Sequence, residues 1–199
     1  MKSENSKNVS LLIIAIAFAT FVYGTIKAME IVDKTQVGTS NGTYTSYVAT
    51  SEEIQGRAYA LTDSCKSELC QAQKLLDFAT GIPYQTKTFQ QYSPQKTIQQ
   101  NFGDCDDKSN LLISMLHALE IEAYFVLVPK HIFIIASIDD KRLGREKGLW
   151  VNGKKYFILE STAKDSKVGF SLHYDLDDID VIVEPFSNEK LTIEKLEWK

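Results

Sequence analysis

The chain has 199 residues and a formal net charge of −4, from 22 basic and 26 acidic side chains. This length suits one domain of ordinary size with a short appendage, and such a domain buries a full core without metal or disulfide staples. The basic residues form no block, which argues against a nucleic-acid-binding protein. We therefore expect no nucleic acid among the partners.

The first 31 residues differ from the rest in composition. Residues 11–26 read LLIIAIAFATFVYGTI and carry no charge. Extended to Ile31, the apolar stretch approaches the roughly 20 residues that cross a bilayer. We therefore predict a transmembrane signal anchor over residues 1–31. A cleaved signal peptide and a buried core helix are the alternatives.

Lys2 and Lys7 precede the apolar stretch and bias the N-terminus toward the cytoplasm. The rest of the chain is then expected on the periplasmic or extracytoplasmic side. Residues 34–46 read KTQVGTSNGTYTS, a composition typical of linkers. We predict a linker over residues 32–46 and a folded domain over residues 47–199.

Helical patterns fill the first part of this domain. Residues 52–80 are helical in character, with a break predicted near 62–64 and a stop at 81–83. Ser93-Pro94 is a helix start signal, with Ser as the N-cap and Pro at the first helical position. Residues 104–119 form the next predicted helix, in which apolar residues recur at helical spacing.

Strand patterns follow the helices. Residues 123–128 (AYFVLV) and 132–138 (IFIIASI) are apolar, aromatic and β-branched. Residues 149–151 and 154–159 flank Asn152-Gly153, a two-residue hairpin signal, and residues 179–183 form a further predicted strand. The order predicts an α+β fold, in which the helices pack on one side of an antiparallel sheet.

Cys105 lies where a buried helix is predicted to begin, in the segment NFGDCDDKS. The partial positive charge of a helix N-terminus favours a thiolate, and a lowered thiol pKa makes cysteine a nucleophile near neutral pH. Gly103 lets the chain turn into the helix. The charges of Asp104, Asp106 and Asp107 oppose the thiolate, although they also suit the first turn of a helix. An unreactive buried cysteine is the alternative.

A thiol nucleophile needs a base nearby. His117 lies on the same predicted helix, about 18 Å from Cys105, so it is excluded as the base. His173 lies in a polar stretch that nothing positions. His131 opens a predicted strand, where it is held rigidly and can lie beside a helix N-terminus packed on the sheet. We predict His131 as the base, with an ordinary loop histidine as the alternative.

The base in turn needs an orienting group. Glu160 ends the apolar strand 154–159. If this strand pairs with the strand that His131 opens, the Glu160 carboxylate reaches the ring nitrogen of His131 that faces away from Cys105. It then fixes the tautomer and stabilises the imidazolium. A charged strand end at the surface is the alternative.

Three blocks carry a family resemblance. GDCDDKSNLLISMLHALEIEAYFVLV, PKHIFIIASI and KKYFILEST resemble the transglutaminase-like superfamily, whose members place Cys at a helix N-terminus and then His and an acid on successive strands. The preceding YSPQKTIQQNFGDC is similar to bacterial members. The resemblance covers residues 75 to about 169 and implies a papain-type triad of Cys105, His131 and Glu160, although Asp is the commoner third member.

The resemblance implies acyl transfer through a thioester, as in a cysteine peptidase or a transglutaminase-like acyltransferase. Cys105 would attack a peptide bond or a glutamine side chain of a protein or peptide substrate. The backbone N–H of Cys105 and one amide of Gln95, Gln99 or Gln100 would hold the oxyanion. Together with the predicted anchor over residues 1–31, the similarity to bacterial members leads us to expect a single-pass protein of the inner membrane. A catalytically silent peptide-binding or scaffolding module of the same fold is the alternative.

Cofactor binding is not expected for this chemistry. Asp104, Asp106 and Asp107 offer oxygen ligands to calcium, but their sequence lacks the spacing of a full calcium loop.

Cys65 and Cys70 are the other two cysteines. Within one continuous helix they would point about 140° apart, but a break near 62–64 allows a disulfide. Such a bridge would suit the periplasm and would leave Cys105 as the odd thiol. Two unpaired cysteines are the alternative.

Overall fold

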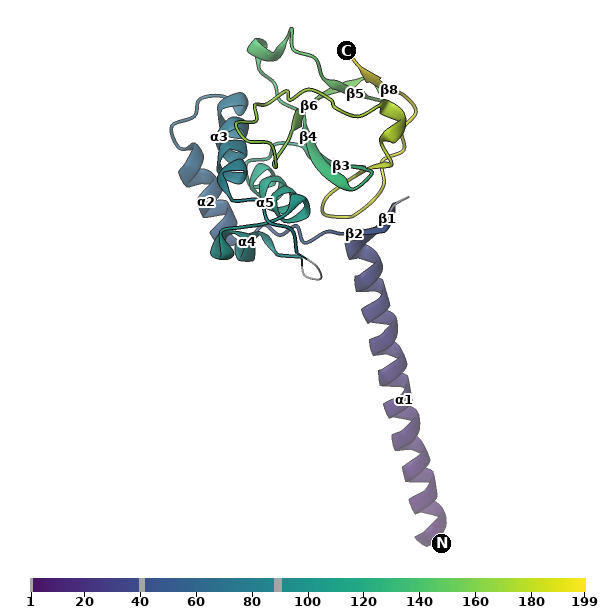
Figure 1. Cartoon of the computed structure of the whole chain (residues 1–199). Helices are drawn as coiled ribbons and strands as arrows, with labels where there is room; N and C mark the ends of the chain where they lie inside the picture. The colour runs from purple at the N-terminus through teal and green to yellow at the C-terminus, as the bar shows by residue number, and fades with distance from the viewer. Residues whose placement is uncertain (1, 40–41, 88–90) are drawn as a thin grey trace. The chain divides into compact units, whose positions relative to one another are not determined.

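The computed structural model describes residues 2–39, 42–87 and 91–199. Its contacts divide the chain into two units, Met1–Gln36 and Val37–Lys199. The first unit is a single helix, α1 (Lys2–Thr35), drawn in purple in Figure 1. The large apolar side chains of α1 between residues 11 and 26 are exposed. Among the helices of the described residues, none is both long enough and apolar enough to cross a membrane.

The stretch predicted as a linker contains β1 (Gln36–Thr39) and β2 (Gly42–Thr45), which pair as a two-stranded sheet. Tyr44 is buried, its ring lies 5.4 Å from that of Phe125, and its hydroxyl donates to Asn110 Oδ1 at 3.0 Å. Part of this stretch therefore contributes to the core of the second unit.

Four helices precede the main sheet: α2 (Glu52–Thr62), α3 (Glu68–Gly81), α4 (Pro94–Gln100) and α5 (Cys105–Ala118). The first three begin after Ser51, Ser67 and Ser93, whose hydroxyls each accept a hydrogen bond from the backbone N–H three residues on. Serine at this position satisfies an N–H that the helix leaves unpaired. The predicted break near 62–64 and the helix start at Ser93 are confirmed.

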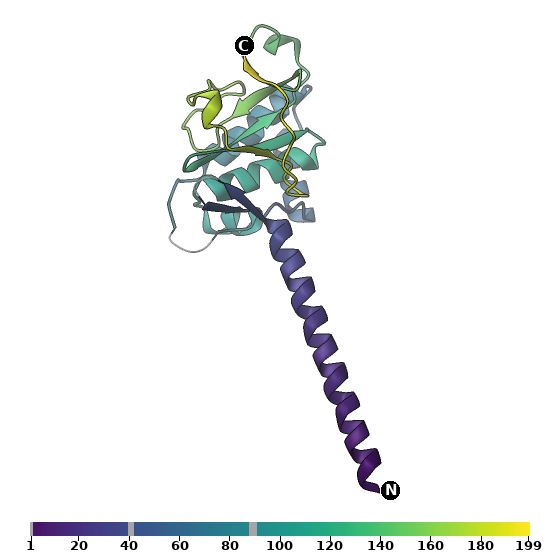
Figure 2. The same ribbon diagram turned by 90° about the vertical axis from the view of Figure 1, so that its right-hand side faces the viewer.

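The main sheet has six strands: β3 (Ala123–Val128), β4 (His131–Ala136), β5 (Leu149–Val151), β6 (Lys154–Leu159), β7 (Val181–Val183) and β8 (Leu196–Trp198). Their order is β7-β3-β4-β6-β5-β8, and each neighbouring pair is antiparallel. Asn152 and Gly153 both have positive φ, 50° and 85°, in the predicted turn between β5 and β6. The edge strand β8, near the C-terminus in Figure 2, was not predicted.

Helices α2, α3, α4 and α5 lie on one side of the main sheet, as Figure 1 shows. α5 packs on α2, α3 and α4, and also on β3 and β4. One buried cluster joins α5 to this face of the sheet through Leu112, Leu116, Leu127, Ile132 and Ile134. The other face is covered by the segment after β6, and its cluster includes Phe133, Ile135, Ile158, Phe170, Leu172 and Tyr174. The predicted α+β architecture is confirmed.

Candidate active site

Cys105 is the first residue of α5, and close packing fixes the chain that leads to it. The Gly103 N–H donates to the Pro83 carbonyl oxygen at 3.1 Å. A Cβ on Gly103 would lie 2.9 Å from Asp107 Cβ and 3.2 Å from Thr97 Cγ2. Residue 103 is therefore glycine because neighbouring side chains occupy the space that a larger residue needs.

Asp104 and Asp107 form a capping box at the start of α5. Asp104 Oδ1 accepts from the Asp107 N–H, and Asp107 Oδ2 accepts from the Asp104 N–H, both at 3.2 Å. Asp107 is fully buried, accepts from the Tyr92 N–H at 2.6 Å and pairs with Lys87. These two carboxylates satisfy the helix start and tie the preceding loop to it.

The three aspartates named as calcium candidates face donors of the protein itself. Asp104 and Asp107 complete the capping box, and Asp106 accepts from Cys105 and Gln91. Within the part of the chain that the structure describes, no group of three or more His, Cys, Asp or Glu side chains is placed to hold a metal. Calcium binding at this position stays a prediction.

The Cys105 thiol is partly buried and unbridged. Its sulfur donates to Asp106 Oδ1 at 3.5 Å. Burial raises the pKa of the Cys105 thiol well above its usual range, and the charges of Asp106 and Asp104 raise it further. The expectation of a lowered pKa is therefore wrong for this arrangement, because burial and two carboxylates outweigh the helix N-terminus.

Gln91 is a neighbour of the thiol that the sequence did not single out. Its amide Nε2 donates to Asp106 Oδ2 at 3.0 Å, on the carboxylate whose other oxygen accepts from Cys105. The three oxyanion candidates predicted from the sequence all lie on α4. Gln95 donates to Ser51 Oγ at 2.6 Å, and Gln99 and Gln100 are exposed. Gln91 precedes the Ser93 cap in a loop, where no periodic pattern could have marked it.

His131 and Glu160 lie together. His131 Nε2 is 2.8 Å from Glu160 Oε2. Glu160 is buried, and its other oxygen accepts from the Thr162 N–H at 2.9 Å and from the Thr162 hydroxyl at 2.5 Å. Burial alone would raise the pKa of Glu160. The hydrogen bond and charge of His131, together with the two hydrogen bonds from Thr162, outweigh the effect of burial and hold this pKa below its usual value. The carboxylate is therefore ionised at neutral pH and accepts the hydrogen bond of the His131 ring.

Two side chains connect this pair with the thiol. The charge of His131 acts on Asp106, the acceptor of the Cys105 thiol, and opposes the rise that burial causes in the pKa of Asp106. Tyr174 stacks beside His131 with ring centroids 6.2 Å apart. Burial raises the pKa of Tyr174, and the charges of Glu160 and Cys105 add to this rise. Asp106 thus interacts with both Cys105 and His131, and Tyr174 lies near all three candidate residues.

The other two histidines make different contacts. His117, on α5, stacks on Phe186 with ring centroids 4.0 Å apart. His173 is exposed and stacks on Phe170 at 5.2 Å. His173 also lines a cavity that His131 lines, so the structure brings it nearer to the site than its sequence context indicated.

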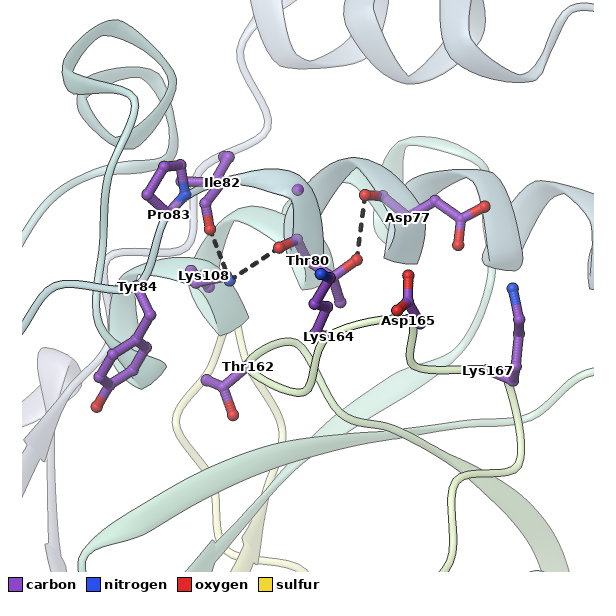
Figure 3. Close-up of a pocket in the computed structure, with 11 residues that line it drawn as sticks. Asp77, Thr80, Ile82, Pro83, Tyr84, Lys108, Thr162, Lys164, Asp165 and Lys167 are labelled. Atoms are coloured by element: carbon purple, nitrogen blue, oxygen red, sulfur yellow. Dashed lines mark hydrogen bonds between the residues drawn. The ribbon is translucent and has the colours of Figure 1, made fainter.

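Two cavities flank Thr162, which lines both of them. One measures about 600 Å³ and includes Tyr84 and Lys108, as Figure 3 shows. In its wall, Lys108 Nζ donates to the carbonyl oxygen of Ile82 at 2.8 Å. The other cavity measures about 270 Å³ and includes His131. His131 and Glu160 thus line a concave surface that could receive a substrate.

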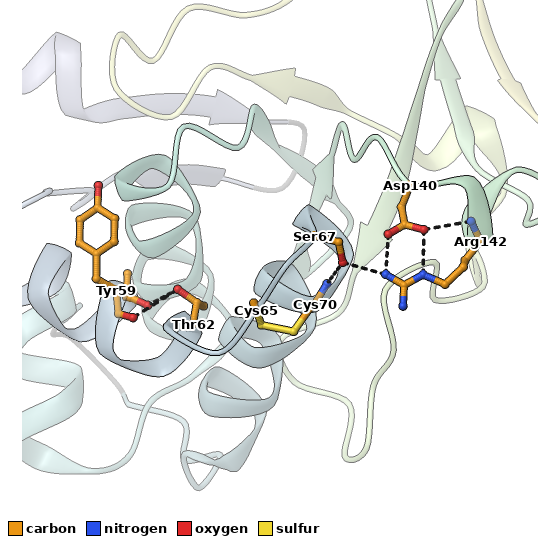
Figure 4. Close-up of a disulfide and its surroundings, with 8 residues drawn as sticks. Tyr59, Thr62, Cys65, Ser67, Cys70, Asp140 and Arg142 are labelled. Carbon is orange, nitrogen blue, oxygen red and sulfur yellow. Dashed lines mark hydrogen bonds and ion pairs between the residues drawn. A yellow bond between two sulfur atoms is a disulfide. The ribbon is translucent and has the colours of Figure 1, made fainter.

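Cys65 and Cys70 form a disulfide between the loop that follows α2 and the first turn of α3, with their Cα atoms 5.4 Å apart. Figure 4 shows Ser67 beside it, which caps α3 and also accepts from Arg142 Nη2 at 2.7 Å. Because the helix breaks between Thr62 and Glu68, the two cysteines are free of the helical spacing that would separate them. Cys105 is the only cysteine outside this bridge.

Part of the second unit is similar to a known protein family. Residues 55–134 match the family model of the transglutaminase-like superfamily. The match runs from α2 into β4, and it includes Cys105 and His131 but ends before Glu160. The resemblance to this superfamily that the sequence blocks indicated is therefore confirmed.

Several solved structures resemble the chain. They include a candidate cysteine protease from Cytophaga hutchinsonii, 23% identical over 59% of this chain and 39% of that one, with a TM-score of 0.46. A candidate protease from Parabacteroides distasonis is 16% identical over 71% of this chain and 27% of that one, with a TM-score of 0.45. LapG of Legionella pneumophila is 17% identical over 62% of this chain and 78% of that one, with a TM-score of 0.43. The chain thus spans less than half of the first two proteins, and no curated protein matches it.

Proposed function

We propose that this protein is a cysteine hydrolase or acyltransferase that attacks an amide carbonyl with Cys105. The observation that carries the proposal is the 2.8 Å contact between buried Glu160 and His131, which lies at the start of a strand that packs against the helix beginning with Cys105. An imidazole held by a buried carboxylate suits a general base, because the carboxylate fixes its tautomer and stabilises its protonated form.

In the proposed reaction, His131 takes the proton of the Cys105 thiol through Nδ1, since Nε2 faces Glu160. The sulfur forms a bond to the carbonyl carbon, and the carbonyl oxygen becomes an oxyanion. When this intermediate collapses, the C–N bond breaks and His131 returns the proton to the departing amine. The acyl group stays on Cys105 as a thioester.

The second half of the reaction decides the product. Water activated by His131 releases the acyl group as an acid, which gives peptide cleavage or glutamine deamidation. An amine in place of water gives a cross-link. Hydrolysis is the outcome we propose first, by analogy with peptidases of this superfamily.

For the oxyanion we propose the backbone N–H of Cys105 and the side-chain amide of Gln91. Cys105 is the first residue of α5, so its N–H has no partner within the helix. Gln91 reaches the carboxylate beside the thiol, whereas Gln95 bonds to Ser51. All groups in this mechanism belong to the chain, so the proposal includes no metal or cofactor.

The proposal is tested by alkylating the full-length protein with iodoacetamide between pH 5 and 9 and following Cys105 by intact mass. Because Cys65 and Cys70 are bridged, Cys105 is the thiol that reacts. We expect a modification rate that rises with pH and that His131→Ala slows, whereas His117→Ala, the matched control on α5, leaves the rate unchanged. Slow modification that is indifferent to His131→Ala would sink the nucleophile proposal.

A catalytically silent peptide-binding module is the second candidate. The observation that favours it is the thiol itself, which donates to Asp106 and has a pKa raised by burial and two carboxylates. A protein of this kind would bind peptides through the same cavities and would show no thiol modification that depends on His131.

Attachment to a bacterial inner membrane, with the second unit on the periplasmic side, is a separate part of the proposal. The support is the uncharged stretch 11–26, whose large apolar side chains are exposed on α1. Fractionation of cells that express the full chain tests this: removal of residues 1–31 is expected to move the protein from the membrane pellet to the soluble fraction. Full solubility of the intact chain would refute it.

A further inference from the structure

The cavity of about 270 Å³ opens directly beside the candidate catalytic pair. His131 and Glu160 line one side of it, while Phe133, Ile158 and Phe170 contribute apolar surface. Phe133 and Ile158 are buried members of the cluster on this face of the sheet. The cavity therefore has a rigid apolar part, supplied by the sheet, next to a polar part that carries the proposed chemistry.

Tyr174 joins these two parts. Its ring stacks on Phe133, with centroids 6.1 Å and planes 10° apart, and on His131, with centroids 6.2 Å and planes 21° apart. The three rings form a continuous surface from the apolar strand to the proposed base. A group bound in the cavity would therefore lie beside the His131 ring.

The size of the cavity restricts its occupant. Sites for whole small-molecule ligands commonly measure about 300–1,000 Å³. A cavity of about 270 Å³ is below that range, so it suits one large side chain of a longer substrate better than a complete ligand. Its aromatic and aliphatic lining favours an apolar side chain, because burial removes apolar surface from water.

The cavity on the other side of Thr162 has the opposite character. Lys164, Lys167, Asp77 and Asp165 line it with charges of both signs (Figure 3). A peptide that crosses Thr162 would thus meet an apolar surface on one side and a charged surface on the other. This difference supplies a matched control within the same molecule.

We propose that the smaller cavity is the specificity pocket of the site and binds a large apolar side chain, such as Leu, Met or Phe, next to the amide that Cys105 attacks. The inference rests on the proposed function for its link to Cys105. An acidic side chain would be disfavoured there, because it would face the ionised Glu160.

Binding is tested without any reaction, on the full-length protein carrying Cys105→Ala. Ligand-observed NMR titrations compare the N-acetyl amides of leucine and phenylalanine with those of alanine and aspartate. We expect the large apolar amides to bind about tenfold more tightly than the alanine amide, a typical gain for added methylene groups in an apolar pocket. Equal affinity for the whole series, or no measurable binding of any amide, overturns the inference.

Two variants locate that preference. Ala163→Leu fills the cavity and is expected to abolish the preference, whereas Phe170→Ala enlarges it and shifts the preference toward the tryptophan amide. Lys167→Ala changes the charged cavity and is expected to leave the preference intact. A preference that survives both Ala163→Leu and Phe170→Ala overturns the inference.

The two proposals fail separately. If Cys105 is indifferent to His131→Ala but the apolar amides still bind in the cavity, the nucleophile proposal fails and the apolar pocket stands. If Cys105 depends on His131 but no amide prefers the cavity, the pocket assignment fails and the proposed chemistry stands.

Discussion

His131 and Glu160 meet across two neighbouring antiparallel strands, with Nε2 and Oε2 2.8 Å apart. The register pairs Ile134 with Leu159, so Glu160 follows the last paired residue of β6 while His131 opens β4. Each residue is thus fixed by the end of a strand, and the sheet itself sets their separation. For this reason the carboxylate that follows β6 can hold the histidine at the start of β4.

Glu160→Gln removes the charge of this pair and retains its shape. We expect the His131-dependent rate of Cys105 alkylation to fall at least about tenfold near pH 7, because the variant lacks the carboxylate that orients the imidazole. The rate is measured by intact mass across pH, with His131→Ala as the baseline.

Glu122→Gln is the matched control. Glu122 also lies beside the sheet, where it pairs with Lys154 and accepts from the Tyr156 hydroxyl. Its change is expected to leave the alkylation rate unaltered. If the two glutamine variants behave alike, the Glu160 carboxylate has no special role toward His131.

Much of the fold follows from the sequence. The serine caps define the starts of α2, α3 and α4, and Asn152-Gly153 defines the turn between β5 and β6. The short strands β1, β2 and β8 were not predicted, because none of them contains an apolar run of the kind that marks β5 and β7. Burial of Tyr44 depends on a contact with Asn110, 66 positions away, which no local pattern contains.

The site follows from the sequence only in part. Cys105, His131 and Glu160 stand at element ends, so their approximate neighbourhood could be predicted from the order of helices and strands. The contact of Gln91 with Asp106 could not, because it depends on how the loop before α4 folds back on α5. The direction of the Cys105 pKa shift was also out of reach, because burial, its largest cause, is a property of tertiary packing.

Asp106→Asn is expected to make Cys105 more reactive. Burial is the main reason for the raised pKa of this thiol, but the charge of Asp106 and its hydrogen bond with the thiol contribute. Asparagine retains the size and removes the charge, so the thiolate becomes less costly. Each unit by which the thiol pKa falls gives about tenfold more thiolate near neutral pH. Alkylation rates measured at pH 7 and 8 check this.

Asp177→Asn serves as the comparison, since Asp177 is an exposed acid in a short helix at residues 176–178. It removes the same formal charge and is expected to have no effect on the alkylation rate. A rate that is equal in both variants and the parent protein would show that Asp106 does not restrain the thiol.

Asp104→Asn is expected to stabilise the fold at pH 7. Burial raises the pKa of Asp104 from 3.8 to about 6, so the folded state binds its proton more tightly than the unfolded state does. The stabilising effect of that proton is complete below about pH 4 and is lost as the pH rises through 6. Asparagine caps a helix about as well as aspartate and carries no charge.

The gain is modest because Asp104 is only half-buried. The full shift would correspond to about 3 kcal/mol, and solvent screening reduces our expectation to about 1 kcal/mol. Urea unfolding at pH 4 and pH 7 measures it: the variant is expected to exceed the parent protein in stability at pH 7 and to match it at pH 4. The opposite order would contradict the assigned pKa direction.

Lys108→Met tests the connection between α3 and α5. Lys108 is fully buried, and its ammonium donates to the carbonyl oxygens of Ile82 at 2.8 Å and Thr80 at 3.4 Å, at the end of α3. Methionine fills similar space but leaves both carbonyl oxygens without this donor, so we expect a loss of about 2–3 kcal/mol in the free energy of unfolding. Lys154→Met breaks the exposed pair with Glu122 and is expected to cost less than about 1 kcal/mol. Equal losses in the two variants would mean that the buried ammonium contributes no more than a surface ion pair.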